Sequence, residues 1–286
     1  MGYQNVIFVG MKDESSTKES FFQDINGKTA IVTGSTKGIG LEIARILLSS
    51  GANVIVNSRN KQDVETTVER LRSKPRFSES VVGLTGDVGV YENCEMLIEE
   101  TVQRFGKVDV LVNNAGTSMI SDSLELQKED WEKAIRTNLS GPFFMSQVCG
   151  RIMAKNRGGS IINISSIFGG GGVPKRLAYC ASKFGLNGLT KTLATEWAHY
   201  KIRVNAVSPG YIKTPMDVGD QTSGGYSAEE INRRTPAGRY GTAREVAQVV
   251  LFLASDFSSY ITGANILVDG GWLAYVGWDK LLNELE

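Results

Sequence analysis

Short apolar runs rich in β-branched residues alternate with longer segments of helical periodicity along most of the chain. The apolar runs predict buried strands at residues 28–33, 53–57, 81–85, 108–112, 160–165, 202–207 and 264–268. Apolar positions at helical spacing predict helices at residues 41–48, 89–105, 128–153, 179–199 and 243–254. No linker interrupts this alternation, which is typical of a parallel sheet with helices on both faces. The pattern predicts one α/β domain with a doubly wound, mostly parallel, seven-stranded sheet.

The domain is expected to occupy residues 27–286, after an N-terminal extension at residues 1–26. An apolar run at residues 6–9 is too short for a signal-peptide core and has no basic stretch before it. Residues 211–240 are polar and contain Gly219, Gly224 and Gly225. A glycine-bearing segment of this length in a compact domain is typical of a mobile lid. We expect it to form a loop that covers the substrate.

A glycine-rich turn joins the first predicted strand to the first predicted helix. Gly34, Gly38 and Gly40 have the spacing G-x-x-x-G-x-G, which differs from the usual dinucleotide fingerprint. A helix that begins at such a turn offers free N–H groups and the positive end of its dipole, which suit a phosphate. The turn is expected to bind a dinucleotide, although a strand–helix turn without a ligand is the simpler interpretation.

Tyr179 and Lys183 lie four residues apart in Y-C-A-S-K, and Ser166 lies thirteen residues before the tyrosine. Residues four apart share one face of a helix, so the phenol and the ammonium should point into the same space. A neighbouring cation is expected to lower the pKa of the tyrosine toward the range of a general acid or base. A solvated helix face is the alternative interpretation of the pair alone.

Composition narrows the classes of partner. The chain has 31 basic and 31 acidic residues, so no net charge favours nucleic acid or an anionic membrane. No apolar stretch approaches the ~20 residues of a membrane span. Cys94, Cys149 and Cys180 form no C-x-x-C motif, and their odd number suits a reducing cytoplasm. His199 is the only histidine, which excludes a metal site built on several histidines.

The chain resembles the short-chain dehydrogenases/reductases over residues 27–272. The glycine motif of that family is met by residues 33–40, its N-N-A-G motif by residues 113–116, and its proline-glycine turn by Pro209 and Gly210, with Thr214 following. The serine, tyrosine and lysine of its catalytic tetrad match Ser166, Tyr179 and Lys183, and its asparagine matches Asn138. Six motifs in the right order make the resemblance specific.

The resemblance implies a Rossmann fold and hydride transfer between a nicotinamide cofactor and a carbonyl or carbinol carbon. It implies that Tyr179 is the acid or base, that Lys183 binds the nicotinamide ribose, and that Ser166 holds the substrate oxygen. Asn138 would steady the helix and a water that relays protons from Lys183. It implies cofactor contacts at Gly34, Ser35, Thr36, Lys37, Gly38, Ile39, Gly40, Ser58, Arg59, Asp87, Val88, Asn114, Ala115, Gly116, Tyr179, Lys183, Pro209, Gly210, Ile212 and Thr214.

NADP is expected rather than NAD. The second predicted strand ends in Asn57, Ser58 and Arg59, where an NAD-binding chain would carry an acidic residue. A guanidinium can bind a phosphate through two charge-assisted hydrogen bonds, and Lys37 adds a second cation nearby. The alternative is that both cations are ordinary surface charges. The resemblance places the Asp87 carboxylate near the adenine amino group, and capping of the next helix is its alternative role.

The residues expected around the substrate indicate only its chemical class. We expect a small polar carbonyl compound or polyol, such as a sugar or sugar acid, with residues 117–120 and 167–172 forming the wall opposite the lid. The main alternative is a 3-oxoacyl-carrier-protein reductase, for which Arg136, Arg151 and Lys155 would have to form a docking patch. A non-enzymatic NADP sensor is the second alternative.

A homotetramer is expected, because members of the family that resemble this chain are mostly tetramers. The segments 128–153 and 268–278 also carry more apolar surface than one subunit should cover. The alternative for the second segment is that it folds over its own subunit's pocket.

Overall fold

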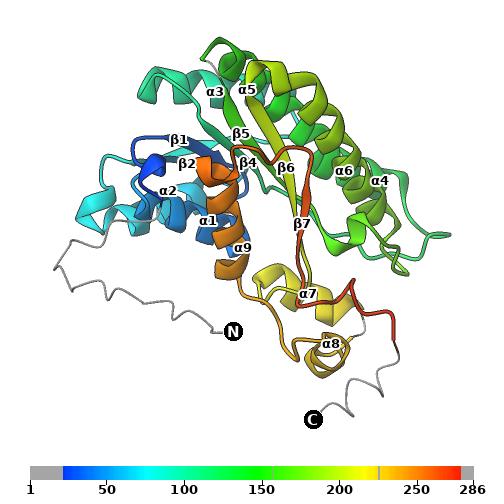
Figure 1. Ribbon diagram of the computed structural model, residues 1–286. Coiled ribbons are helices and arrows are strands. Elements are labelled where there is room, and N and C mark those ends of the chain that lie inside the picture. The colour runs from blue at the N-terminus through cyan, green and yellow to red at the C-terminus, as the bar shows by residue number, and fades with distance from the viewer. Residues whose placement is uncertain (1–21, 157, 225, 278–286) are drawn as a thin grey trace, which may run out of the picture.

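The computed structural model describes residues 22–156, 158–224 and 226–277. Its centre is a seven-stranded sheet with the strand order β3-β2-β1-β4-β5-β6-β7, in which every neighbouring pair is parallel (Figure 1). The strands are β1 (Thr29–Val32), β2 (Asn53–Ser58), β3 (Val81–Thr85), β4 (Val110–Asn113), β5 (Gly159–Ile164), β6 (Ile202–Pro209) and β7 (Asn265–Val268). The predicted doubly wound α/β sheet is confirmed.

The helices form a layer on each face of the sheet because the central strands are buried on both sides, as in other parallel sheets. One core joins the sheet to α1 (Gly38–Ser49), α2 (Lys61–Arg72) and α9 (Ala243–Ala254). The other core joins it to α3 (Tyr91–Phe105), α5 (Gly141–Lys155) and α6 (Leu177–Trp197). The short helix α4 (Lys128–Ile135) lies beside α6 (Figure 1).

The structure divides the predicted helix at residues 128–153. Between α4 and α5 the chain makes a π-helical segment, η3 (Arg136–Ser140), which contains Asn138. Apolar periodicity alone does not reveal this insertion, because the helical direction continues through it. π segments are rare and occur frequently at functional sites.

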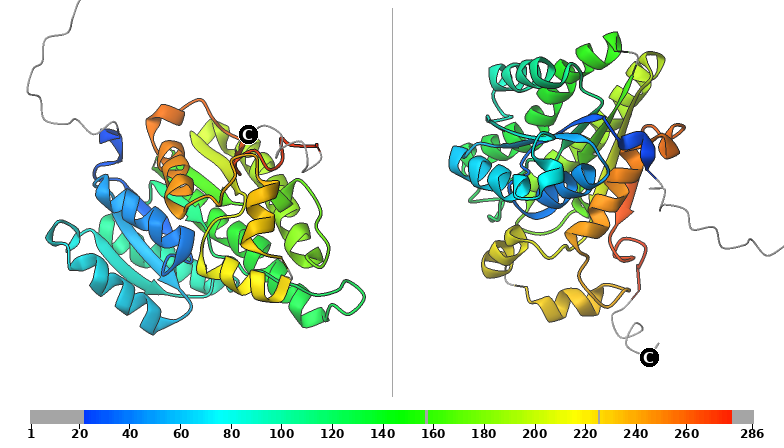
Figure 2. Two further views of the ribbon diagram at one scale, coloured as in Figure 1. Left: turned by 90° about the horizontal axis from the view of Figure 1, so that it is seen from below. Right: turned by 90° about the vertical axis from the view of Figure 1, so that its left-hand side faces the viewer.

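The predicted loop at residues 211–240 is wrong in its secondary structure. It contains α7 (Pro215–Gly224) and α8 (Ala228–Arg234), which lie together at one end of the molecule (Figure 2). The sequence holds the missed signal. Ser227 accepts a hydrogen bond from the Glu230 N–H, and the Glu230 carboxylate accepts one from the Ser227 N–H. This capping box begins α8. We call residues 211–240 the cap.

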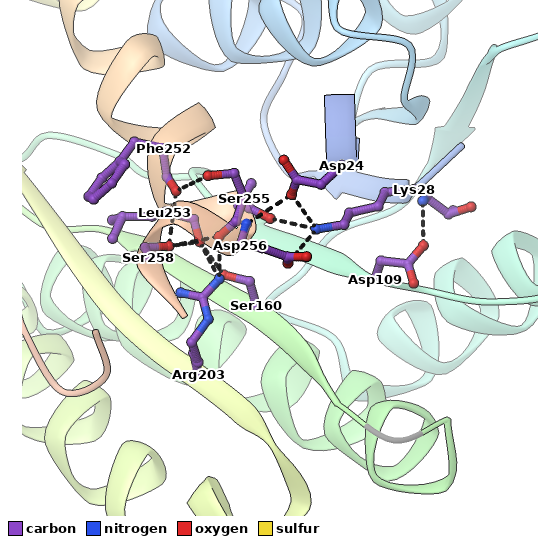
Figure 3. Close-up of polar contacts among 12 residues, drawn as sticks. Asp24, Lys28, Asp109, Ser160, Arg203, Phe252, Leu253, Ser255, Asp256 and Ser258 are labelled. Atoms are coloured by element: carbon purple, nitrogen blue, oxygen red, sulfur yellow. Dashed lines mark hydrogen bonds and ion pairs between the residues drawn. The ribbon is translucent and has the colours of Figure 1, made fainter. Parts of the chain in front are cut away.

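A satisfied polar cluster closes the amino end of the sheet (Figure 3). The Lys28 ammonium pairs with Asp24 at 2.9 Å and with Asp256 at 3.1 Å. Arg203 donates to the carbonyl of Leu253 at 2.7 Å and also to that of Ser255. These bonds tie β1, β6 and the segment before β1 to the carboxyl end of α9.

Several sequence predictions lie outside the described residues. They include the extension at residues 1–21, Gly225 of the cap, and Trp278 of the apolar C-terminal stretch. No helix in the described part of the chain is long and apolar enough to cross a membrane.

Candidate active site

A cavity of about 990 Å³ opens at the carboxyl ends of the strands. Residues that follow β1, β2, β3, β4, β5 and β6 line it, and the cap supplies its remaining wall. The strand order reverses between β1 and β4, and open α/β sheets bind ligands at such a switch point. The volume lies at the upper end of the range for small-molecule sites.

The glycines of the turn allow close packing against the loop that follows β4. Gly34 has a φ of +61°, and a Cβ there would come within 2.8 Å of the Ala115 Cα. A Cβ on Gly40 would collide with the side-chain nitrogen of Asn114. That nitrogen donates to the carbonyls of Thr33 and Gly34 at 2.8 and 2.9 Å, which joins the two loops at the switch point. Lys37, Gly38 and Ile39 at the N-terminus of α1 line the cavity, so this helix end suits an anionic group.

Two cations stand at this end of the cavity. Lys37 precedes α1, Arg59 follows β2, and both side chains are exposed where they line the cavity. Neither makes an ion pair or side-chain hydrogen bond with any residue in the described ranges. Exposed cations at a helix N-terminus are suited to a phosphate. This arrangement fits the phosphate contacts expected from the sequence.

Tyr179, Lys183 and Ser166 line the same cavity and lie close together. Tyr179 and Lys183 lie one turn apart on α6, with the ammonium 5.5 Å from the centre of the phenol ring. Ser166 follows β5 and begins a short 3₁₀ helix, where its hydroxyl accepts a bond from the Phe168 N–H at 3.1 Å. Ser166 also forms a hydrogen bond with the Tyr179 hydroxyl.

The pKa of Tyr179 departs from the prediction. Desolvation raises its pKa above the usual value of 10.0, more than the Ser166 hydrogen bond and the nearby Arg176 charge lower it. The lowering expected from Lys183 is wrong here, because the ammonium donates to the Ile164 carbonyl at 2.7 Å instead of the phenol oxygen. Burial lowers the pKa of Lys183 itself to about 8.

Two predicted site residues do not line the cavity. Asn138 is fully buried, and its amide donates to the carbonyl of Thr117 at 2.9 Å and to the hydroxyl of Ser182 at 3.1 Å. Ser182 in turn donates to the Tyr179 carbonyl at 2.7 Å, so Asn138 connects the π segment to the helix that carries the tyrosine. Ser35 is also fully buried; its hydroxyl donates to the Val32 carbonyl of β1 and accepts from the Asn57 N–H of β2 at 3.0 Å, which holds the two strands together.

The other predicted catalytic and cofactor residues line the cavity together. Of the predicted wall at residues 117–120 and 167–172, only Thr117, Ser118 and Phe168 line it. Two lining residues were not singled out from the sequence. They are Arg176, which precedes Tyr179 by one helical turn, and Tyr226 of the cap. Arg176 donates to Ser118 at 2.6 Å and to Asp220 at 2.7 Å. Its spacing of three from Tyr179 on a helix was the available signal.

Asp87 accepts a bond from the Gly89 N–H at 2.9 Å, at the turn that precedes α3. It also lines the cavity. The alternative role of capping the next helix is wrong, because the N-cap of α3 is Val90 and no side chain caps it. Among the described residues no group of three or more His, Cys, Asp or Glu side chains is arranged to hold a metal ion.

Comparison with known proteins identifies the family. Residues 34–273 match the family model described as enoyl-(acyl carrier protein) reductase. The chain is 40% identical over 248 residues to the 3-oxoacyl-[acyl-carrier-protein] reductase FabG of Thermotoga maritima, covering 86% of this chain and 98% of that protein. It is 37% identical over 258 residues to the NAD-dependent glycerol dehydrogenase of Listeria innocua, covering 90% and 98%.

A solved relative shares the whole fold. The gluconate 5-dehydrogenase of Burkholderia cenocepacia, in complex with NADP and tartrate, superposes with a TM-score of 0.83 at 33% identity, covering 88% of this chain and 97% of that one. The sheet order, the cavity at the switch point and these similarities agree. The chain belongs to the short-chain dehydrogenase/reductase family and is an NAD(P)-dependent oxidoreductase.

Proposed function

We propose that this enzyme interconverts a secondary alcohol and a ketone on a small polar substrate of the sugar, sugar-acid or polyol type, with NADP as its cofactor. The observation that carries the proposal is the convergence of Tyr179, Lys183 and Ser166 on one cavity whose far end holds Lys37 and Arg59. Of the four residues expected to be catalytic, Ser166, Tyr179 and Lys183 act on the substrate and the cofactor, and Asn138 positions the helix that carries Tyr179.

The bound cofactor supplies or accepts the hydride, and the chain's own residues handle the proton. In reduction the Tyr179 hydroxyl protonates the alkoxide oxygen, and in oxidation its phenolate removes the alcohol proton. Ser166 holds that oxygen through its hydroxyl, which already reaches the phenol. Such proton transfer contributes typically 10²–10⁴-fold to the rate.

Lys183 would bind the nicotinamide ribose through its ammonium, whose pKa of about 8 lies near neutral pH. The ammonium donates to the Ile164 carbonyl at 2.7 Å and not to the phenol oxygen, so desolvation decides the direction of the Tyr179 pKa shift. Asn138 acts through Ser182 and Thr117, and so positions the catalytic helix without touching the cavity.

NADP is favoured over NAD by the charges at the phosphate end. Arg59 and Lys37 both line the cavity near the end of β2, and β2 ends in Ser58 without an acidic side chain. The solved Burkholderia relative is described with NADP, and the Listeria relative is described as NAD-dependent. The exposed cations of this chain support the first of these two cofactors.

Reduction of a 3-oxoacyl thioester is the second candidate, supported by the 40% identity to the Thermotoga reductase. An acyl carrier protein is acidic and requires a basic docking surface. Arg151 lies on α5 with Lys155, and its guanidinium contacts the Tyr91 hydroxyl at 3.1 Å. Arg136 belongs to the π segment, where its stem packs near Gly89.

A homotetramer is part of the proposal. Apolar side chains remain exposed on neighbouring helices, namely Trp131, Phe143, Leu177 and Phe184. The apolar segment after β7 is only partly covered by its own subunit. The ring centres of Trp272 and Tyr211 are 4.9 Å apart, whereas Val276 is 95% exposed. The contact of Trp272 with the cap supports the alternative that part of the tail shapes its own subunit's pocket.

The test is NADPH oxidation by purified protein with ketoses, keto acids and 3-oxoacyl thioesters side by side. We expect turnover of a ketose or keto acid, and a loss of at least ~10²-fold in Tyr179→Phe with the NADPH dissociation constant nearly unchanged. Exclusive turnover of thioesters would establish the second candidate. Binding of NADPH without turnover of any compound would favour the sensor. More than a few per cent of wild-type activity in Tyr179→Phe would assign the proton to another group.

A further inference from the structure

An ion pair crosses the substrate end of the cavity. Arg176 lies just before α6, and its side chain is only 9% exposed. Its Nη1 donates to Asp220 Oδ2 on α7 at 2.7 Å and to Ser118 Oγ at 2.6 Å. Ser118 also donates to the same Asp220 oxygen at 3.1 Å. The triad links the catalytic helix, the loop after β4 and the cap.

Two nitrogens of Arg176 and one oxygen of Asp220 have no hydrogen-bond partner among the described residues. Nε and Nη2 of Arg176 and Oδ1 of Asp220 make no hydrogen bond with the described residues, and both side chains line the cavity. A hydroxyl group can donate to the carboxylate and accept from the guanidinium at once. A carboxylate group on a substrate can only accept hydrogen bonds. It could accept from the guanidinium, but it would offer the Asp220 oxygen no donor and would repel its charge.

The negative charge of the cap also favours a hydroxyl group over a carboxylate at this end of the cavity. Asp217 also lines the cavity, where it accepts from Gln221 at 2.7 Å and from Tyr226 at 3.4 Å. Burial raises the pKa of Asp217, and the charge of Asp220 raises it further. The cap wall therefore carries two carboxylates for the single guanidinium of Arg176. Lys183, the other cation beside Tyr179, is bonded to the Ile164 carbonyl.

Aromatic side chains complete this wall. The ring of Phe168 lies edge to face with those of Tyr179 and Tyr211, with 6.5 and 6.2 Å between ring centres. The ring centres of Tyr211 and Tyr226 are 5.5 Å apart. Phe168, Tyr211 and Tyr226 all line the cavity. Rings with few polar atoms suit the C–H face of a carbon chain whose hydroxyls point the other way.

We propose that Arg176 and Asp220 read adjacent hydroxyls of an uncharged polyol or ketose, and that Asp220 selects against the corresponding sugar acid. This inference rests on the proposed function and narrows its substrate class. The pair is built from hydrogen bonds on three elements, so its free donors and acceptor are fixed in place before the substrate binds.

The experiment compares matched neutral and acidic substrates in the oxidative direction with NADP. Threitol is paired with threonate, and glucitol with gluconate, and kcat/KM is measured for each. The variant Asp220→Asn keeps the shape of the side chain and removes its charge. We expect wild-type enzyme to prefer the polyol of a pair, and Asp220→Asn to raise the acid-to-polyol ratio about tenfold or more.

Two further variants separate recognition from loosening of the cap. Arg176→Gln leaves Asp220 without its cation, so the acid-to-polyol ratio should fall. Glu229→Gln makes the same charge change on the exposed face of α8, outside the cavity, and should leave the ratio within about twofold of wild type. Loss of packing alone would lower kcat/KM for both substrates together. It would not raise the acid-to-polyol ratio in one variant and lower it in the other.

The outcomes distinguish the inference from the function on which it rests. A wild-type preference for the acids, or a ratio that moves in neither Asp220→Asn nor Arg176→Gln, would overturn the inference while leaving the oxidoreductase proposal intact. Turnover of thioesters without any polyol or sugar acid would overturn the proposed function, and this inference with it.

Discussion

Replacing Lys183 by methionine should make the protein more stable at neutral pH while abolishing turnover. Lys183 is 4% exposed, and burial lowers its pKa from the usual 10.5 to about 8. At pH 7 Lys183 is therefore charged in the folded protein, although burial disfavours the charged form. At about 1.4 kcal/mol per pKa unit, this costs about 3 kcal/mol of folding free energy.

The hydrogen bond to the Ile164 carbonyl opposes the gain, because methionine leaves that oxygen without its donor. A lost bond of this kind costs about 1 kcal/mol. The expected net increase in the free energy of unfolding at pH 7 is thus about 2 kcal/mol. Methionine has a similar length and no charge, so little new cavity is created.

The pH dependence gives the sharper test. Between the folded pKa near 8 and the usual value of 10.5, the unfolded chain binds more protons than the folded one, so wild-type stability rises with pH. The advantage of Lys183→Met should therefore be full below pH 8 and shrink as the pH approaches 10.5. Urea unfolding at pH 7 and pH 9.5, at one protein concentration, measures it.

A matched control is Lys191→Met, which removes an exposed lysine from the same helix and should change stability little at either pH. The reasoning fails if Lys183→Met is less stable than wild type at pH 7. It also fails if the difference between the two proteins is the same at both pH values.

Three further predictions follow from other parts of the structure. Arg59→Asp should weaken NADPH binding by at least about tenfold and leave NADH nearly unchanged, as measured by titration, and equal losses would make Arg59 structural. Thr242→Ala removes the capping box that begins α9 and should lower the free energy of unfolding by about 1 kcal/mol in urea. Light scattering at micromolar concentration should give four times the 31.1 kDa of one chain.

The sheet was predictable because its signals are local. The central strands are short apolar runs that the structure buries, such as Val54 to Val56 in β2, and alternation with helices dictates parallel pairing. The glycine turn and the Tyr179–Lys183 pair are likewise set by spacing within one or two elements. These predictions needed no knowledge of distant contacts.

The cap could not be predicted from the same signals. Its helices carry few buried side chains, such as Ile231 in α8, so apolar periodicity is weak. The Arg176–Asp220 pair joins residues 44 positions apart, and no local pattern pairs them. The pKa of Tyr179 was mispredicted for a related reason, because desolvation depends on the packing around the ring.

The cations at the two ends of the sheet differ in whether they have protein partners. At the amino end Lys28 has two carboxylate partners, and Arg203 is held by carbonyls at the end of α9. At the carboxyl end Lys37 and Arg59 lack such partners within the described residues, and Arg176 retains free donors. Satisfied groups stabilise the fold, whereas free ones are available to a ligand.

This division follows from the parallel topology. Every strand brings its carboxyl end to the same edge, so the loops that follow them are the ones that can build a shared site. Desolvation of Lys183 at that edge lowers the stability of the fold, whereas the cluster at the other edge requires no ligand to satisfy it. The stability that Lys183→Met should recover is therefore the cost, in folding free energy, of holding a cation where the reaction requires one.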